Sequence, residues 1–106
     1  MYFHGKKLLP KIKSVITSDY PSSEIILYGS RSRGQEDAFS DWDILVVTEE
    51  NLTQNEKIEI HNKIFEIELE TGEIISAVIH TRDEWNRPLM QLTPFYQNVI
   101  NEGIPI

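Results

Sequence analysis

Two aspartates stand at the start of the most hydrophobic segment of the sequence. Asp41 and Asp43 flank Trp42 and lead directly into the run ILVV. Burying an ionised carboxylate is costly unless a positive group compensates it. Residues at i and i+2 of a strand point to the same face, so the two carboxylates are expected to converge on one point. Such a pair is typical of a site for Mg²⁺ or Mn²⁺, since carboxylate, phosphate and water oxygens suit these ions.

A phosphate-binding turn is predicted just upstream of the aspartates. Gly29 and Ser30 follow the apolar run EIILY. Gly29 would let the backbone approach a phosphate closely. The N–H groups after it and the Ser30 hydroxyl suit the β- and γ-phosphates of a nucleoside triphosphate. Arg31 and Arg33 are candidates for additional charge-assisted hydrogen bonds, although a surface position suits Arg31 better.

Together these residues fit the requirements of nucleotidyl transfer. The triphosphate must be held, its charge neutralised and its α-phosphorus placed in line with an acceptor oxygen. Two metal ions held by carboxylates roughly 3.5–4 Å apart can perform the last two tasks. The simpler alternatives are solvated carboxylates at a strand edge and an ordinary glycine–serine turn. The spacing between the Gly29–Ser30 turn and the Asp41–Asp43 pair favours a metal site over these alternatives.

Composition and charge narrow the remaining possibilities. The chain has 106 residues and no cysteine, which fits one domain and excludes thiolate chemistry. No segment has the length or composition of a membrane span or a signal peptide, so a cytoplasmic location is expected. The net charge is −7, which argues against a nucleic-acid backbone as the main partner. Six of the ten basic residues nevertheless lie within residues 1–34, close to the predicted phosphate site.

Hydrophobic periodicity predicts alternating helices and strands. Helices are expected over 6–18, over a segment from Thr53 to Gly72, and over 94–102 after the N-cap Thr93. Pro10 predicts that the first helix begins near residue 8 or 9, or that it is kinked. Strands are expected over 24–29, 41–48 and 73–81, one helical turn over 30–34, a loop over 35–40, and a turn or short helix at TRDEW. The pattern predicts a small sheet with helices packed on it.

The motif resembles that of a known enzyme family. Ser30 and Asp41 are separated by ten residues, and the stretch GSRSRGQEDAFSDWDILV is similar to the minimal nucleotidyltransferases of the DNA polymerase β-like superfamily. Arg33, Gly34 and Ser40 also occupy motif positions, which makes Ser40 a further nucleotide-binding candidate. The resemblance implies an α+β fold with a small mixed sheet flanked by helices, and a single nucleotidyltransferase domain over residues 1–106.

The resemblance also implies ligands and a partner. Mg²⁺, or Mn²⁺, would bind at Asp41 and Asp43, and a nucleoside triphosphate such as ATP at Gly29 and Ser30. Many members of the family act beside a partner protein with a helical HEPN domain. Some are antitoxins that adenylylate a tyrosine of that partner.

One position departs from the family pattern. A third acidic residue is usual on the next core strand, as metal ligand or general base, but here the equivalent residue is Ser76. His80 shares the face of Ser76 by period two and is the candidate replacement for the base. Glu73 and Asp83 also lie nearby in the sequence. Without a replacement, nucleotide binding would survive while the rate falls by roughly 10²–10⁴-fold.

Two functions therefore compete. The first is Mg²⁺-dependent transfer of a nucleoside monophosphate, AMP from ATP, to a hydroxyl of a HEPN-type partner. The second is a catalytically weakened or inactive module that neutralises a partner by contact alone. A third possibility is the modification of a small cationic compound that carries a hydroxyl group. The larger relatives that do this use a second domain to complete the pocket, and the 106 residues are expected to form only one domain.

Overall fold

The computed structural model describes residues 4–34 and 40–106. Its helices are α1 (His4–Asp19), α2 (Gln54–Thr71), α3 (Arg82–Trp85), α4 (Pro88–Gln91) and α5 (Pro94–Glu102), and its strands are β1 (Glu24–Tyr28), β2 (Trp42–Thr48), β3 (Ile75–Thr81) and β4 (Ile104–Pro105). The strands form one sheet in the order β3-β2-β1-β4. Strand β2 is parallel to β3 and antiparallel to β1, which also pairs with β4 in antiparallel fashion. This mixed sheet with flanking helices confirms the predicted α+β class.

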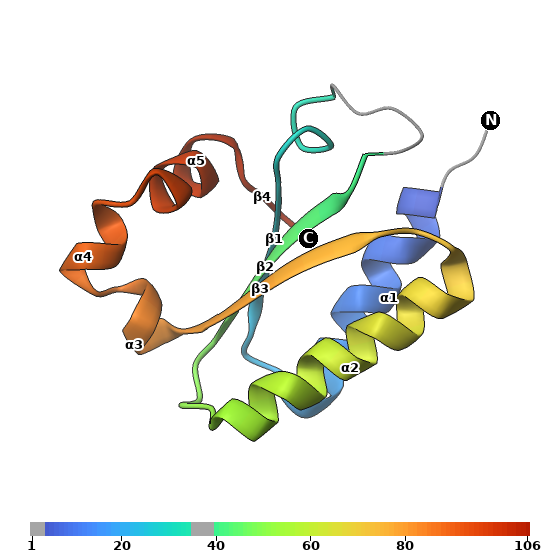
Figure 1. Ribbon diagram of the computed structural model, residues 1–106, viewed down its shortest axis with the longest axis horizontal. Coiled ribbons are helices and arrows are strands. Elements are labelled where there is room, and N and C mark those ends of the chain that lie inside the picture. The colour runs from blue at the N-terminus through green and yellow to red at the C-terminus, as the bar shows by residue number, and fades with distance from the viewer. Residues whose placement is uncertain (1–3, 35–39) are drawn as a thin grey trace.

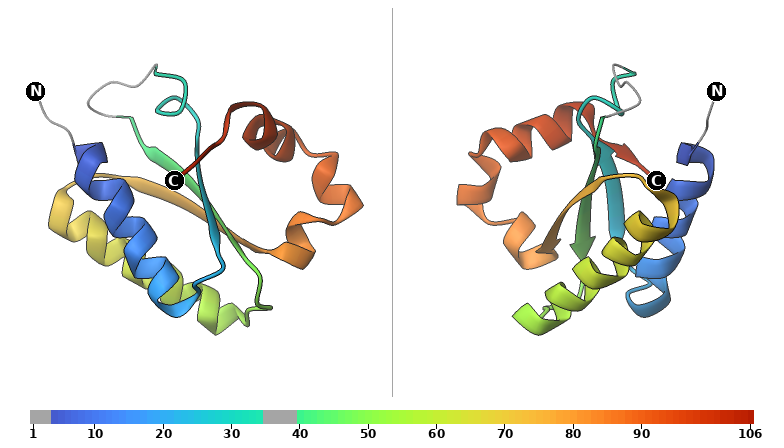
Figure 2. Two further views of the ribbon diagram at one scale, coloured as in Figure 1. Left: turned by 180° about the vertical axis from the view of Figure 1, so that it is seen from behind. Right: turned by 45° about the vertical axis from the view of Figure 1, so that its right-hand side comes forward.

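The sheet separates two layers of helices. Helices α1 and α2 cover one face, and α3, α4 and α5 cover the other (Figures 1 and 2). Strand β2 serves both layers, because Ile44 and Val46 belong to the cluster under α1 and α2 while Leu45 and Val47 belong to the cluster under α3 and α5. All four side chains are fully buried. The apolar run ILVV is therefore explained by burial on both sides of one strand.

Helix α1 begins earlier than the sequence predicts. It starts at His4 and carries Pro10 inside, whereas Pro10 predicts a start near residue 8 or 9 or a kink. An internal proline removes one backbone hydrogen bond and costs about 3 kcal/mol. Leu8, Ile12 and Ile16 lie on one buried face of the helix and pack into the core beneath the sheet. Tertiary packing of this face outweighs the local cost, as is usual for helices in proteins.

Helix α2 confirms both of its predicted ends. The Thr53 hydroxyl accepts a hydrogen bond from the Glu56 N–H at 3.1 Å, and the Glu56 carboxylate accepts one from the Thr53 N–H at 2.9 Å. Gly72 ends the helix with a φ of 75°, a left-handed conformation that favours glycine. Its buried residues Ile60, Ile64 and Ile67 face α1 and the sheet.

The C-terminal part contains two elements that the sequence pattern did not reveal. The turn or short helix predicted at TRDEW is the helix α3, and the helix after the predicted N-cap Thr93 is α5. Thr81 also caps α3, a cap that was not predicted from the sequence. Helix α4 has four residues and β4 has two, which is too short for a periodic pattern to emerge. Strand β4 nonetheless matters, because Ile104 and Pro105 pair with β1 and anchor the end of α5 against the sheet. Within the described residues, no helix combines the length and apolarity that a membrane crossing demands.

Candidate nucleotide and metal site

A glycine turn at the end of β1 lies directly against an aspartate of β2. Gly29 has a φ of +79°, and a Cβ built on it would stand 2.2 Å from Oδ2 of Asp43. After Gly29 the chain turns tightly, with the Ser32 N–H donating to the Gly29 carbonyl at 3.1 Å and the Arg33 N–H to the Ser30 carbonyl at 3.2 Å. The predicted helical turn over 30–34 is thus a series of hydrogen-bonded turns. Only glycine permits both the backbone angle and the approach of the carboxylate.

The two aspartates lie beside this turn. Asp43 sits in β2 between Tyr28 of β1 and Ser76 of β3, and Asp41 stands one residue before β2 begins. Burial raises the pKa of Asp43 above its ordinary value, and the negative charges of Asp41 and Glu102 raise it further, against the lowering effect of Arg33. Burial and the charge of Asp43 raise the pKa of Tyr28 to about 12. A cation at this position would relieve the repulsion around Asp43.

The donor set suits an ion whose other ligands come from a substrate. Within residues 4–34 and 40–106, no three acidic or histidine side chains lie close enough together to hold a metal by themselves. Asp41 and Asp43 would therefore supply only part of a coordination shell. Mg²⁺ is commonly bound in this way, by one or two carboxylates with phosphate oxygens and waters completing the octahedron. The residues present fit such an ion.

Arg33 and Gly29 share an acidic partner that the sequence did not suggest. Glu102, at the end of α5, accepts a hydrogen bond from the Gly29 N–H at 3.2 Å and pairs with Nη1 of Arg33 at 2.5 Å. The bond to Arg33 lowers the pKa of Glu102. The residue lies 73 positions after Gly29, and nothing in the local pattern of α5 marks it as part of this site.

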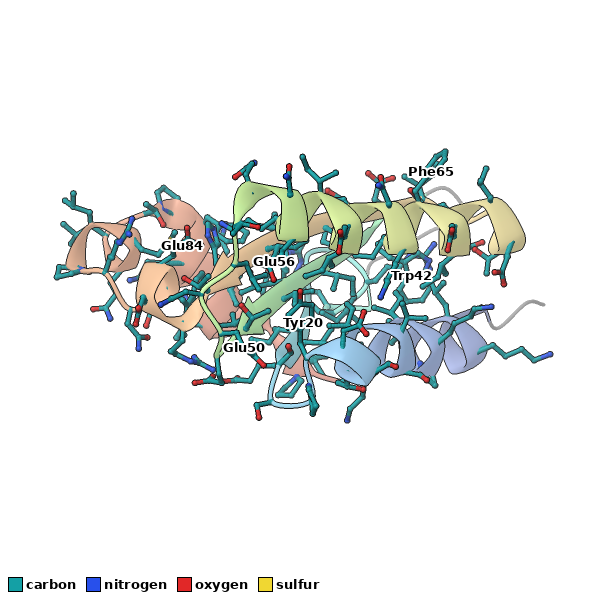
Figure 3. All side chains as sticks on the ribbon, turned by 90° about the horizontal axis from the view of Figure 1, so that it is seen from below. Tyr20, Trp42, Glu50, Glu56, Phe65 and Glu84 are labelled. Atoms are coloured by element: carbon teal, nitrogen blue, oxygen red, sulfur yellow. The ribbon has the colours of Figure 1, made fainter. Side chains whose placement is uncertain are left out.

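Arg31 lies on the opposite side of β2 from Asp43. Its guanidinium stacks over the Trp42 ring with 4.0 Å to the centroid, and it donates to the Ser40 carbonyl at 3.1 and 2.9 Å. Glu73 stands 3.7 Å from Arg31 and accepts a 2.7 Å hydrogen bond from the Trp42 indole. Figure 3 shows Trp42 between α1 and α2. The side chain of Arg31 is only 6% exposed, so the predicted surface position is wrong.

This network gives Arg31 a positioning role. It ties the turn after Gly29 to Ser40, immediately before Asp41. The loop predicted over 35–40 lies, except for Ser40, outside the described residues. The predicted nucleotide contacts of Arg31 and Ser40 remain predictions. In the structure, both residues act on the site through the backbone that leads into β2.

The register of β3 separates Ser76 from His80. Ser76 pairs with Asp43, which places a hydroxyl where the family pattern expects an acid, and its side chain is exposed. His80 shares this face but pairs with Val47, four residues and about 13 Å further along the strand. It stacks on Trp85 with 6.2 Å between ring centroids, and its Nδ1 lies 3.5 Å from Glu84. His80 is therefore not brought to the aspartates, because two strand residues of one face can still stand at opposite ends.

Comparisons with known proteins agree with this fold. The model of the family described as polymerase beta, nucleotidyltransferase matches residues 10–106. A crystal structure of a toxin–antitoxin with AMP-PNP has a TM-score of 0.56 at 22% identity, with 89% of this chain and 70% of that chain covered. A crystal structure of a mutant of the toxin–antitoxin MntA–HpeT has a TM-score of 0.59 at 20% identity, with 100% of this chain and 72% of that chain covered. The structure of a candidate minimal nucleotidyltransferase has a TM-score of 0.61 at 22% identity, with 95% of this chain and 94% of that chain covered. No curated protein matches the sequence.

Proposed function

The chain belongs to the polymerase β nucleotidyltransferase family, and on that premise we propose that it transfers AMP from ATP to a hydroxyl of a partner protein. The observation that carries the proposal is the contact of the Gly29 turn with Asp43, since a phosphate held at the turn would lie next to a carboxylate pair. Phosphoryl-type transfers depend mainly on positioning and on charge neutralisation. Both requirements can be met at this turn.

Each residue has a defined task in the proposed reaction. The N–H groups after Gly29 and the Ser30 hydroxyl bind the β- and γ-phosphates. Arg33 stabilises negative charge on the leaving pyrophosphate. Asp41 and Asp43 would hold Mg²⁺, or Mn²⁺, which would supply neutralisation of the triphosphate and polarisation of its α-phosphate. Ser76 offers no general base at neutral pH, so the acceptor hydroxyl must lose its proton to another group or to water.

The proposed partner is a protein with a helical HEPN domain. Two of the similar structures are toxin–antitoxin complexes, one of them with AMP-PNP. The outer face of α2 offers apolar contact area, with Ile58, Phe65 and Leu69 exposed by 47, 55 and 70%. Figure 3 shows Phe65 pointing away from the body of the molecule. The net charge of −7 favours a protein or a nucleotide over a nucleic acid.

Incubation with α-labelled ATP, Mg²⁺ and a purified HEPN-domain protein as the proposed partner tests the proposal. We expect label on the partner with the wild-type protein and with Asp83→Asn, a matched change at an exposed surface aspartate. Asp43→Asn should lower the rate at least about 100-fold, because it removes a charged ligand while keeping the shape. Absence of label with the wild type, or equal labelling by Asp43→Asn, would contradict enzymatic transfer.

The position of Ser76 supports a second candidate function. With a hydroxyl beside Asp43 on β3, the domain would retain the nucleotide site and neutralise its partner by contact alone. A toxicity assay in cells distinguishes the two. Neutralisation that survives Asp41→Ala favours contact, whereas neutralisation lost in Asp41→Ala but kept in Asp83→Asn favours chemistry.

A further inference from the structure

We propose that the Glu102 carboxylate occupies the phosphate position of the site and thereby limits its affinity for the triphosphate. This inference rests on the proposed function, because it concerns the same turn. It assigns Glu102 as a determinant of nucleotide affinity, a residue that must turn aside when the nucleotide enters.

The contacts of Glu102 are those expected of a bound phosphate. One carboxylate oxygen accepts from the Gly29 N–H at 3.2 Å, and the other pairs with Arg33 at 2.5 Å. A carboxylate and a phosphate are both anionic oxygen acceptors and recruit the same backbone and guanidinium donors. Arg33, which the proposed function assigns to the pyrophosphate, and the Gly29 N–H at the start of the same turn are therefore both engaged by one side chain of the protein.

The fold holds Glu102 at this position. Gly103 follows it, and a Cβ on Gly103 would stand 2.5 Å from the Val99 carbonyl and 2.6 Å from Cγ2 of Ile26, so the chain passes very close to β1. The next residues pair with β1 as β4. The end of α5 is thus fastened to β1, the strand that leads into the Gly29 turn, and this places the Glu102 carboxylate at the turn.

The helix itself does not favour an acid at this place. Glu102 is the last residue of α5, where the exposed carbonyl groups carry partial negative charge and disfavour a carboxylate. It also adds negative charge beside Asp43. Arg33 and the Gly29 N–H compensate both effects. A triphosphate that takes these donors must displace Glu102, and part of its binding free energy is spent on that displacement.

Calorimetry with inorganic tripolyphosphate and with Mg²⁺–ATP tests the proposal. We expect Glu102→Gln to raise the affinity for tripolyphosphate about threefold to tenfold over wild type, because the competing charge is gone. Glu70→Gln is the matched control: it removes the same charge from an exposed pair with Lys11 and should change the affinity less than twofold. Arg33→Gln combined with Glu102→Gln should abolish the gain.

The outcomes separate this inference from the proposed function. Equal or weaker binding by Glu102→Gln, with wild-type binding intact, overturns the inference alone, and weaker binding would make Glu102 a supporting ligand. Absence of triphosphate binding by the wild type, by Glu102→Gln and by Glu70→Gln overturns the inference and the proposed function together. The backbone amide resonance of Gly29 gives a readout that needs no activity. It should shift in the wild type when tripolyphosphate is added, and Glu102→Gln alone should already shift it.

Discussion

At the scale of single residues, the site is defined by close contacts between groups distant in the sequence. Asp43 lies against the Gly29 turn and stands opposite Ser76 in the pairing of β2 with β3. The negative charges of Asp41 and Glu102 raise its pKa. A metal ion would balance this excess of negative charge, and Ser76 supplies a hydroxyl where the family pattern expects one more carboxylate. The residues therefore account for binding more fully than for proton transfer.

Replacing Ser76 by aspartate should strengthen metal binding. The new carboxylate would lie beside Asp43 in the register of β2 and β3, and cation affinity rises with the number of charged ligands. We expect about tenfold tighter Mn²⁺ binding in the presence of ATP, measured by calorimetry. The metal-free protein should melt at a lower temperature and recover on addition of Mn²⁺. Ser76→Asn, which adds bulk without charge, should show neither effect; equal behaviour of the two variants would contradict the prediction.

Replacing Gly29 by alanine should lower the free energy of unfolding more than replacing Gly72 by alanine. Gly29 and Gly72 have φ values of 79° and 75°, but a Cβ on Gly72 meets nothing within 4 Å, whereas one on Gly29 meets Asp43. Gly72→Ala should lose about 1–2 kcal/mol of unfolding free energy from backbone strain alone. Gly29→Ala should lose at least about 1 kcal/mol more, since Asp43 must move. Urea unfolding measures both, and similar losses would show that the contact with Asp43 is easily relieved.

At the scale of elements, capping and ion pairs fasten the short C-terminal helices to the sheet. The Glu84 carboxylate of α3 accepts from the Thr81 N–H at 2.9 Å and from the Lys57 ammonium of α2 at 2.9 and 3.0 Å. Arg82 pairs with Glu24 of β1 and with Glu49 after β2. These contacts join α3 to the end of the sheet opposite the Gly29 turn, and His80 belongs to this end.

Glu84 should make stability depend on pH. Burial by itself would raise the pKa of Glu84, but the hydrogen bonds from Thr81 and Lys57 outweigh it and lower the pKa to about 2. A carboxylate with a depressed folded-state pKa stabilises the protein above the unfolded value of 4.5 and loses this contribution as pH falls toward 2. The wild type should exceed Glu84→Gln by about 2 kcal/mol in unfolding free energy at pH 7, and the difference should vanish near pH 2.

Glu66→Gln provides the control for the pH series. Glu66 is exposed on α2, so its substitution should leave the pH dependence of stability nearly unchanged. Urea titrations between pH 7 and pH 2 measure all three proteins. A difference between wild type and Glu84→Gln that stays constant with pH would contradict the assigned cause.

At the scale of the whole molecule, one sheet joins two hydrophobic clusters. The larger cluster lies under α1 and α2, and the smaller one lies under α3 and α5. Strand β2 contributes alternate residues to each, and the Gly29 turn and Asp43 stand at one end of it. The helices on the two faces thus pack on the strands that carry the site, and β2 contributes buried residues to both clusters.

Cavity-forming substitutions in the two clusters should be additive. Ile64 of α2 and Val99 of α5 are each 2% exposed and lie on opposite faces of the sheet. Ile64→Ala should cost about 2–4 kcal/mol and Val99→Ala about 1.5–3 kcal/mol of unfolding free energy. The double variant should equal the sum within about 0.5 kcal/mol, and fluorescence and circular dichroism should report one transition. Separate transitions would show that the two layers unfold independently.

The sequence by itself determined the features that depend on local chemistry. The capping box at Thr53, the three longer strands and the presence of helices packed on a sheet followed from periodicity and from threonine and glycine positions. The family, and with it the mixed α+β fold, followed from the resemblance carried by the spacing of Ser30 and Asp41. These signals arise from residues a few positions apart, where propensity and hydrogen bonding act directly.

Tertiary structure alone decided which distant residues meet. Pairing of β2 with β3 put Ser76, and not His80, beside Asp43. Stacking on Trp42 placed Arg31 on the other face of the strand. The two-residue strand β4 carried Glu102 to a glycine 73 positions away. Such contacts depend on register and on packing between elements, and no local pattern records them.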